Sequence, residues 1–278
     1  MHAHFFPEKL FSSIWRWFGD RCWHISYQYP PAELARRLRD EGVTRFVTYN
    51  YAHKAGMAAA LNEWTAAFAR REEGALPFAT VVPQDEGNVA MLENLFERHG
   101  FLGIKLQPLV SDFFLCDERM MDVYRLLLER GKILAVHAGT APVANEFVGA
   151  DHFEPVLERL PELKVVVAHM GAFEFDRFFG MVRDYPNVYL DTSVNFIDPR
   201  LIASLVSQGK FPPLEVPSVF DEGVLLEFAD RLLFGSDFPN IPYTYEDCVQ
   251  SILALDLGEE FNRKLFFENA ESLLRGAA

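Results

Sequence analysis

The sequence has few of the features that mark secreted, membrane or nucleic-acid-binding proteins. Its three cysteines, Cys22, Cys116 and Cys248, lie far apart and form no CxxC pair, so no disulfide framework is expected. No apolar run approaches the roughly 20 residues of a membrane helix, and no signal peptide is visible at the start. A net charge of −14, from 26 basic and 40 acidic residues, disfavours partners with phosphate backbones or anionic membrane surfaces. We expect a cytoplasmic protein with neither nucleic acid nor membrane as partner.

The sequence contains many short apolar runs, and these runs are rich in β-branched residues. The chain has 278 residues, half of them hydrophobic, which is enough for a large core. Continuous apolar runs of this length are typical of strands buried on both faces of a parallel sheet. They span residues 45–49, 77–82, 102–106, 132–137, 163–169, 187–191 and 231–235, and residues 1–6 are an eighth candidate.

Amphipathic segments alternate with these runs and predict helices. They cover residues 31–41, 55–73, 88–99 and 117–130, with apolar residues at intervals of three and four. Repeated strand–helix units predict an α/β fold, as either a closed barrel or an open doubly wound sheet. The early strands lack a Gly-rich dinucleotide motif or a P-loop, which disfavours an open nucleotide-binding sheet.

Side chains that can bind metal lie at or near the carboxyl ends of several expected strands. His2 and His4 are two apart, so both imidazoles lie on one face of an extended segment. His137 and His169 each end an apolar run, and Asp237 follows another. In a parallel barrel these ends converge on one mouth, where catalytic groups collect. Imidazole and carboxylate are good ligands for divalent transition metals.

Seven motifs in this order resemble the amidohydrolase superfamily, and specifically its amidohydrolase-related branch. That branch includes aminocarboxymuconate-semialdehyde decarboxylase, γ-resorcylate decarboxylase and pyrone dicarboxylate lactonase. The motifs lie at residues 2–7, 103–108, 136–139, 168–171, 187–193, 233–239 and 268–270, and so span nearly the whole chain. The resemblance implies a (β/α)8 TIM barrel that forms a single domain over residues 1–278.

The resemblance also implies one divalent metal, with zinc expected and manganese or iron as alternatives. By motif position the ligands would be His2, His4, His137 and Asp237, and Asp237 would also move a proton. His169 would polarise the bound water or the substrate, and it could donate to a developing oxyanion. A metal lowers the pKa of its bound water to about 7, which explains why such a ligand set is needed.

The sequence departs from the family pattern at two places. The chain begins at Met1-His2, where relatives have an apolar lead-in and an Asp. Gln107 stands where many relatives have His, so we interpret it as a substrate contact, together with Asn240. Lys105 is expected to pair with an acid or to bind a substrate carboxylate. As an alternative, a carbamylated Lys105 would bridge two metals, as in other superfamily members.

The connection over residues 7–43 carries three of the four tryptophans, Trp15, Trp17 and Trp23. Because it follows the first strand, it is expected over the barrel mouth, and we interpret Trp15 and Trp23 as the wall of a pocket for an apolar or aromatic substrate. A small cap or a subunit interface is an equal alternative. Arg21, beside these rings, is a candidate anion anchor or a solvated surface residue.

These features predict a metal-dependent hydrolase that acts on an amide, ester or lactone of a small organic molecule. The alternative is nonoxidative decarboxylation of an aromatic or unsaturated acid, since the same metal site would serve both reactions. A barrel that only binds a ligand is disfavoured because all five candidate site residues are present. A small-molecule substrate is the expected partner, and a homodimer is a further hypothesis.

Overall fold

The computed structural model describes residues 1–212 and 220–278 of the chain. Seven parallel strands pair in the order of the sequence, from β1 next to β2 through to β7. Each of them falls on one of the seven apolar runs, which confirms the expected α/β barrel. The strands are β1 (Phe46–Thr48), β2 (Ala75–Ala79), β3 (Gly103–Leu106), β4 (Ile133–Val136), β5 (Lys164–Val167), β6 (Val188–Asp191) and β7 (Leu232–Leu233).

The start of the chain lies between the first and last strands and closes the barrel. It forms two isolated parallel bridges instead of a regular strand, from Ala3 to Phe238 and from His4 to Tyr49. The backbone N–H of His4 donates to Phe238 O at 2.7 Å, and that of Tyr49 donates to Ala3 O at 2.8 Å. The eighth run therefore occupies the expected place, although its pairing is limited to these bridges.

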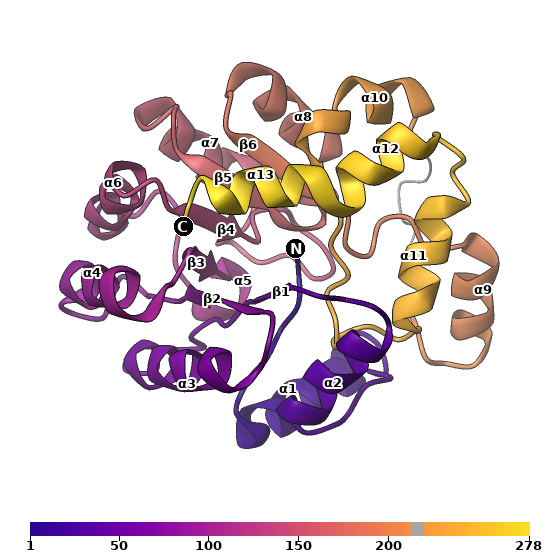
Figure 1. Cartoon of the computed structure of the whole chain (residues 1–278), viewed down its shortest axis with the longest axis horizontal. Helices are drawn as coiled ribbons and strands as arrows, with labels where there is room; N and C mark the ends of the chain where they lie inside the picture. The colour runs from indigo at the N-terminus through magenta and orange to yellow at the C-terminus, as the bar shows by residue number, and fades with distance from the viewer. Residues whose placement is uncertain (213–219) are drawn as a thin grey trace.

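Helices surround the strands as a ring (Figure 1). They pack apolar faces on the barrel, as the three- and four-residue spacing predicted. The α-helices are α1 (Glu8–Arg21), α2 (Pro31–Asp40), α3 (Ala58–Arg71), α4 (Asn88–His99), α5 (Pro108–Ser111), α6 (Met121–Glu129), α7 (Ala150–Arg159), α8 (Phe175–Asp184), α9 (Pro199–Ser207), α10 (Glu222–Glu227), α11 (Tyr245–Leu253), α12 (Glu259–Arg263) and α13 (Asn269–Arg275). Short turns of other helical types are η1 (Glu118–Met120), η2 (Ala168–Gly171), η3 (Ala229–Arg231) and η4 (Lys264–Glu268). None of the helices in the described ranges is long and apolar enough to span a membrane.

The last helix, α13, crosses one end of the barrel (Figure 1). Leu273, Leu274 and Ala277 pack into a cluster with residues of β1, β2, β4, β5 and β7. Lys132 and Lys164, at the start of neighbouring strands, donate to the carbonyls of Ala277 and Gly276, each at 2.6 Å. Helix α13 and the residues after it thus cover the amino ends of these strands.

Candidate active site

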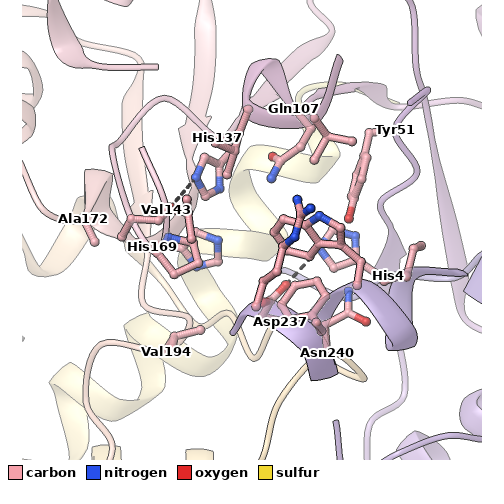
Figure 2. Close-up of a pocket in the computed structure, with 18 of the residues that line it drawn as sticks. His4, Tyr51, Gln107, His137, Val143, His169, Ala172, Val194, Asp237 and Asn240 are labelled. Carbon is pink, nitrogen blue, oxygen red and sulfur yellow. Dashed lines mark hydrogen bonds and ion pairs between the residues drawn. The ribbon is translucent and has the colours of Figure 1, made fainter. Parts of the chain in front are cut away.

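A cavity of about 560 Å³ lies at the carboxyl ends of the strands. Its walls come from the start of the chain, from α1 and from the loops that follow β1, β3, β4, β5, β6 and β7. Figure 2 shows His137 and His169 on one side of this pocket and His4 and Tyr51 on the other. All five residues expected at the metal site line the cavity: His2, His4, His137, His169 and Asp237.

Three of these residues form a tight cluster. His4 Nε2 lies 2.9 Å from Asp237 Oδ1 and 2.9 Å from His2 Nε2, and His2 Nε2 lies 3.4 Å from the same carboxylate oxygen. All three side chains are nearly inaccessible to solvent. They are one of two His/Asp groups in the described chain whose ligand atoms are close enough to share a metal.

The outer hydrogen bonds of His2 and His4 show which nitrogen carries the proton. His2 Nδ1 lies 2.9 Å from the Asp191 carboxylate, and His4 Nδ1 lies 2.9 Å from the carbonyl of Tyr49. Both partners are acceptors, so each Nδ1 donates, and in the neutral form of each ring Nε2 keeps its lone pair. Two nitrogen lone pairs and a carboxylate oxygen therefore face one another at hydrogen-bond distance. Such a set of acceptors fits a cation.

The pKa values of the cluster agree with this protonation. Burial lowers the pKa of His2 to about 3, although the Asp191 carboxylate opposes the change, so the ring is neutral. Burial alone would raise the pKa of Asp237, but its contact with His4 and the nearby His2 and His169 outweigh burial and lower the value to about 2. A neutral imidazole and an ionised carboxylate are the forms of these side chains that bind a divalent metal.

His137 lies outside this tight group but offers one more lone pair to the cavity. Its Nε2 lies 2.8 Å from the carbonyl of Ala141 and must donate to it. Its Nδ1 is buried and has no hydrogen-bond partner in the described chain. An orphaned acceptor on the cavity wall fits a fourth ligand, as expected from the sequence.

Asp191 and Ser193 lie in the family motif at residues 187–193, but neither was among the candidate site residues. Asp191 ends β6 and is fully buried, and its carboxylate contacts His2 Nδ1, the backbone N–H of His169 and Ser193. With His2 and His169 it forms the second group of potential ligands. The apolar run before Asp191 resembles those before His137 and His169, so its position at a strand end was the available signal.

Two of the expected catalytic residues have an unusual backbone. His169 and Asp237 have φ values of 55° and 58°, in the left-handed region that non-glycine residues rarely adopt. Asp112 and Val194, which also line the cavity, share this conformation. Each such residue costs about 1–3 kcal/mol and tends to occur at functional sites. The strain is therefore concentrated around this cavity.

Lys105, on β3, extends into the barrel beneath the cluster. It is fully buried, its ammonium lies 5.1 Å from the centre of the Tyr49 ring, and it has no ion pair within the described residues. Burial lowers the pKa of Lys105 to about 8, although Asp191 and Asp237 oppose the change. The expected pairing with an acid is thus absent at contact distance within the described residues.

Several polar atoms on the cavity wall also lack partners within the described chain. Gln107 Oε1 and Asn240 Oδ1, both expected to contact substrate, are buried without a hydrogen bond. His53 Nε2, on the loop after β1, is in the same state, and burial lowers the pKa of His53 to about 4. Buried polar groups are normally satisfied, so these atoms are candidates for contacts with a bound molecule.

The aromatic connection lies over the mouth, but its tryptophans differ in role. Trp17 and Trp23 line the cavity, as does Arg21. Trp23 stacks on Phe211 and donates its indole N–H to Asn240 O at 2.7 Å, so only its ring is available to a substrate. Trp15, in contrast, is absent from the cavity wall and stacks on Phe11. Because α1 turns about 100° per residue, Trp15 and Trp17 lie on different faces.

The family model for amidohydrolases matches residues 1–276. The chain belongs to the amidohydrolase family. Its members are enzymes of the hydrolase or decarboxylase type that depend on a metal, which confirms the family expected from the motifs. The search of curated proteins found no match.

Solved structures share the fold of this amidohydrolase at low sequence identity. A TIM-barrel protein of uncharacterised function from Bordetella bronchiseptica is 18% identical, with a TM-score of 0.71 over 99% of this chain and 98% of the other. 5-Carboxyvanillate decarboxylase from Novosphingobium aromaticivorans, solved with manganese, is 17% identical (TM-score 0.64, 99% and 95% coverage). A probable 2-pyrone-4,6-dicarboxylic acid hydrolase from Acinetobacter baumannii is 16% identical (TM-score 0.64, 99% and 97% coverage). These likenesses support the barrel fold.

Proposed function

We propose that this amidohydrolase is a metal-dependent hydrolase that cleaves an ester, lactone or amide of a small organic acid. The observation that carries the proposal is the set of bare acceptors, His2 Nε2, His4 Nε2 and Asp237 Oδ1, which face one another on the cavity wall. His137 Nδ1 would complete the ligand set, and zinc is the proposed metal. When bound, such a metal activates water and polarises a carbonyl.

The chain itself would provide the proton transfers and the orientation of the reactants. Asp237 uses Oδ1 in the cluster, so its second oxygen can accept a proton from an attacking water and pass it to the leaving group. His169 lines the same cavity and can contact the water or the substrate. The strained backbone at both residues is consistent with side chains held in place for reaction.

The proposed substrate class follows from charge and shape. Lys105 is a buried cation without an acidic partner at contact distance in the described chain, so it would bind a substrate carboxylate. Trp17 and Trp23 give the cavity apolar walls, and its volume is that of a small-molecule site. Gln107 and Asn240 would bind polar groups of the same molecule. A cytoplasmic location and a homodimer stay predictions.

Decarboxylation of an aromatic or unsaturated acid is the second candidate, and Lys105 favours it. A decarboxylase should hold the substrate carboxylate near the metal, through a cation or a bond to the metal, and this ammonium lies in the same cavity as the ligand cluster. The reaction releases carbon dioxide from the carboxylate, and the carbon then takes a proton. Asp237 could supply that proton once protonated.

The first experiment measures the metal content and the reaction type together. Purified protein is expected to contain about one divalent metal per chain, and His4→Ala and Asp237→Ala are expected to lose it. His99→Ala, an exposed histidine on α4, is the matched control and should keep it. A panel of esters, lactones, amides and aromatic acids is then read for acid release and for carbon dioxide. Protein that stays metal-free after growth in zinc and manganese would contradict both candidates.

A further inference from the structure

Four hydrogen bonds converge on the Asp191 carboxylate. Oδ1 receives the backbone N–H groups of His169 at 3.2 Å and Ser193 at 3.1 Å, together with the Ser193 hydroxyl. Oδ2 lies 2.9 Å from His2 Nδ1. The two backbone groups can only donate, so Oδ1 acts as an acceptor, and a carboxylate with four donors around it is held as the anion.

The Ser193 hydroxyl has only one proton, and its direction determines the next bond. Because the Asp191 carboxylate can only accept, the hydroxyl donates its proton to Oδ1. Ser193 Oγ also lies 2.8 Å from His169 Nδ1 and 3.2 Å from His2 Nδ1. Both contacts must therefore run in the opposite sense, from the imidazole to the hydroxyl oxygen.

The backbone of Ser193 gives the same direction independently. Its carbonyl oxygen lies 3.4 Å from His169 Nδ1, and a carbonyl can only accept. The hydroxyl oxygen and the carbonyl oxygen of Ser193 can thus both accept a hydrogen bond from a proton on His169 Nδ1. His169 Nε2, the other nitrogen, has no hydrogen bond within the described residues, and the side chain lines the cavity.

We infer that Ser193 is a positioning residue that, with Asp191, holds His169 in the Nδ1–H form, so that its Nε2 offers a lone pair to the cavity. In this form His169 accepts a hydrogen bond from the attacking water, or from a substrate hydroxyl. It does not donate to an oxyanion, which was one of the roles expected for His169, whereas its expected contact with the water or the substrate is kept. The catalytic role of this tautomer rests on the proposed function, whereas the assignment of the tautomer does not depend on it.

The Asp191 carboxylate would thereby fix the tautomers of two imidazoles that have different roles. Asp191 fixes His2 with Nε2 bare toward the ligand cluster, and through Ser193 it fixes His169 with Nε2 bare toward the reacting group. In hydrolysis, one O–H of the attacking water would then point to Asp237, which takes the proton. The other O–H would point to His169, which orients the water without taking its proton.

The decisive measurement is the tautomer of His169 in the zinc-loaded protein, which is diamagnetic. Long-range ¹H–¹⁵N spectra of protein labelled at histidine distinguish a protonated from a bare ring nitrogen, and His169→Gln identifies the signals. We expect a protonated Nδ1 and a bare Nε2. A protonated Nε2 in the wild-type protein would overturn the inference, whatever the activity.

Variants separate positioning from a structural role. Ser193→Ala is expected to give mixed His169 tautomers and to lower kcat about 10- to 100-fold while zinc and KM are kept. Ser193→Thr keeps the hydroxyl and should restore both. Asp191→Asn should reduce zinc affinity as well, because it also disturbs His2. Ser251→Ala, another buried serine whose hydroxyl accepts a hydrogen bond away from the site, is the matched control.

The outcomes distinguish this inference from the proposed function. If Ser193→Ala behaves like Ser251→Ala in both spectrum and kcat, the positioning role is wrong even if the enzyme is a hydrolase. If no substrate is found but the wild-type spectrum shows the Nδ1–H form and Ser193→Ala changes it, the tautomer assignment stands and only the reaction is wrong. The spectrum of the wild-type protein suffices if Ser193→Thr fails to fold.

Discussion

The two ends of the barrel differ in whether their buried charged and polar groups have hydrogen-bond or ion-pair partners. At the end covered by α13, Lys132 and Lys164 donate to the last carbonyls of the chain, and leucines fill the interior. At the other end, Lys105 has no acidic partner at contact distance among the described residues, and acceptor atoms of His2, His4 and Asp237 face one another. At the α13 end the two lysines are bonded and the interior is largely apolar, although the Tyr49 hydroxyl of the same cluster has no partner in the described chain, whereas the other end gathers several polar groups without partners.

This difference separates stability from function within one fold. Satisfied hydrogen bonds and close packing contribute free energy of folding, whereas bare acceptors, a buried cation and left-handed backbone all cost it. The unfavourable features collect around the cavity, where a metal and an anionic substrate would satisfy them. Substitutions at the two ends should therefore affect different measurements, in the order given below.

The largest effect is expected from the ligand cluster. Removing the metal with a chelator, or replacing His4 by Ala, should lower kcat/KM by on the order of 10³-fold or more, because a metal supplies several kcal/mol of transition-state stabilisation. Added zinc or manganese should restore the chelated enzyme but not the variant. His99→Ala should match the wild-type protein, and full activity in the presence of chelator would contradict the metal-dependent mechanism.

At the opposite end, Leu273→Ala tests the stability function of α13. Loss of this buried side chain should reduce the free energy of unfolding by about 2–5 kcal/mol, because it leaves a cavity in the inner cluster. Denaturant titration measures the change, and kcat/KM of the folded enzyme should stay the same. A similar loss of kcat/KM would show that the two ends are coupled.

Two lysines make a matched pair across the barrel. Lys105→Met should raise KM for a carboxylate substrate about 10- to 100-fold, since a hydrogen bond to a charged group contributes about 1.5–3 kcal/mol. It should leave the melting temperature unchanged or higher, because an uncompensated buried charge is removed.

Lys132→Met should have the reverse effect. It should lower stability by about 1.5–3 kcal/mol through loss of the bond to Ala277, with unchanged KM. Equal effects of Lys105→Met and Lys132→Met on melting temperature and on KM would contradict the assignment of substrate binding to one end of the barrel and stability to the other.

The smallest effect concerns the aromatic wall. Trp23→Phe removes the indole N–H that binds Asn240 O and should cost about 1 kcal/mol of stability with a few-fold change in KM. Trp15→Phe should change neither, because its indole N–H has no partner in the described chain and its ring is not part of the cavity wall. Substrate titration and thermal melts of both variants measure this.

Much of the fold was predictable from local pattern. All seven apolar runs are strands, because continuous β-branched runs of that length suit a sheet buried on both faces. The five residues at the strand ends meet at one cavity for the same reason, since parallel strands carry their carboxyl ends to one side. The placement of Trp23 on the wall was also expected, but Trp15 lies elsewhere, since which helix face meets the mouth depends on packing.

Asp191 shows the limit of that reasoning. Its position at a strand end is visible in the sequence, but so are many acids at strand ends, and nothing local pairs it with His2, which is 189 residues away. The role of Ser193 depends in turn on the direction of its bonds to Asp191 and His169. Such contacts between loops of different strands arise only when the barrel closes.

The sequence by itself determined the positions of the strands along the chain, the family, and the histidines and aspartate that could bind a metal, because these depend on periodicity, motifs and residue type along the chain. The tertiary structure alone decided which groups each imidazole nitrogen contacts, that Lys105 has no acid at contact distance in the described chain, and which tryptophans face the cavity. These properties depend on distances between atoms brought together by closure of the barrel, and on the direction of each hydrogen bond, which no single segment contains.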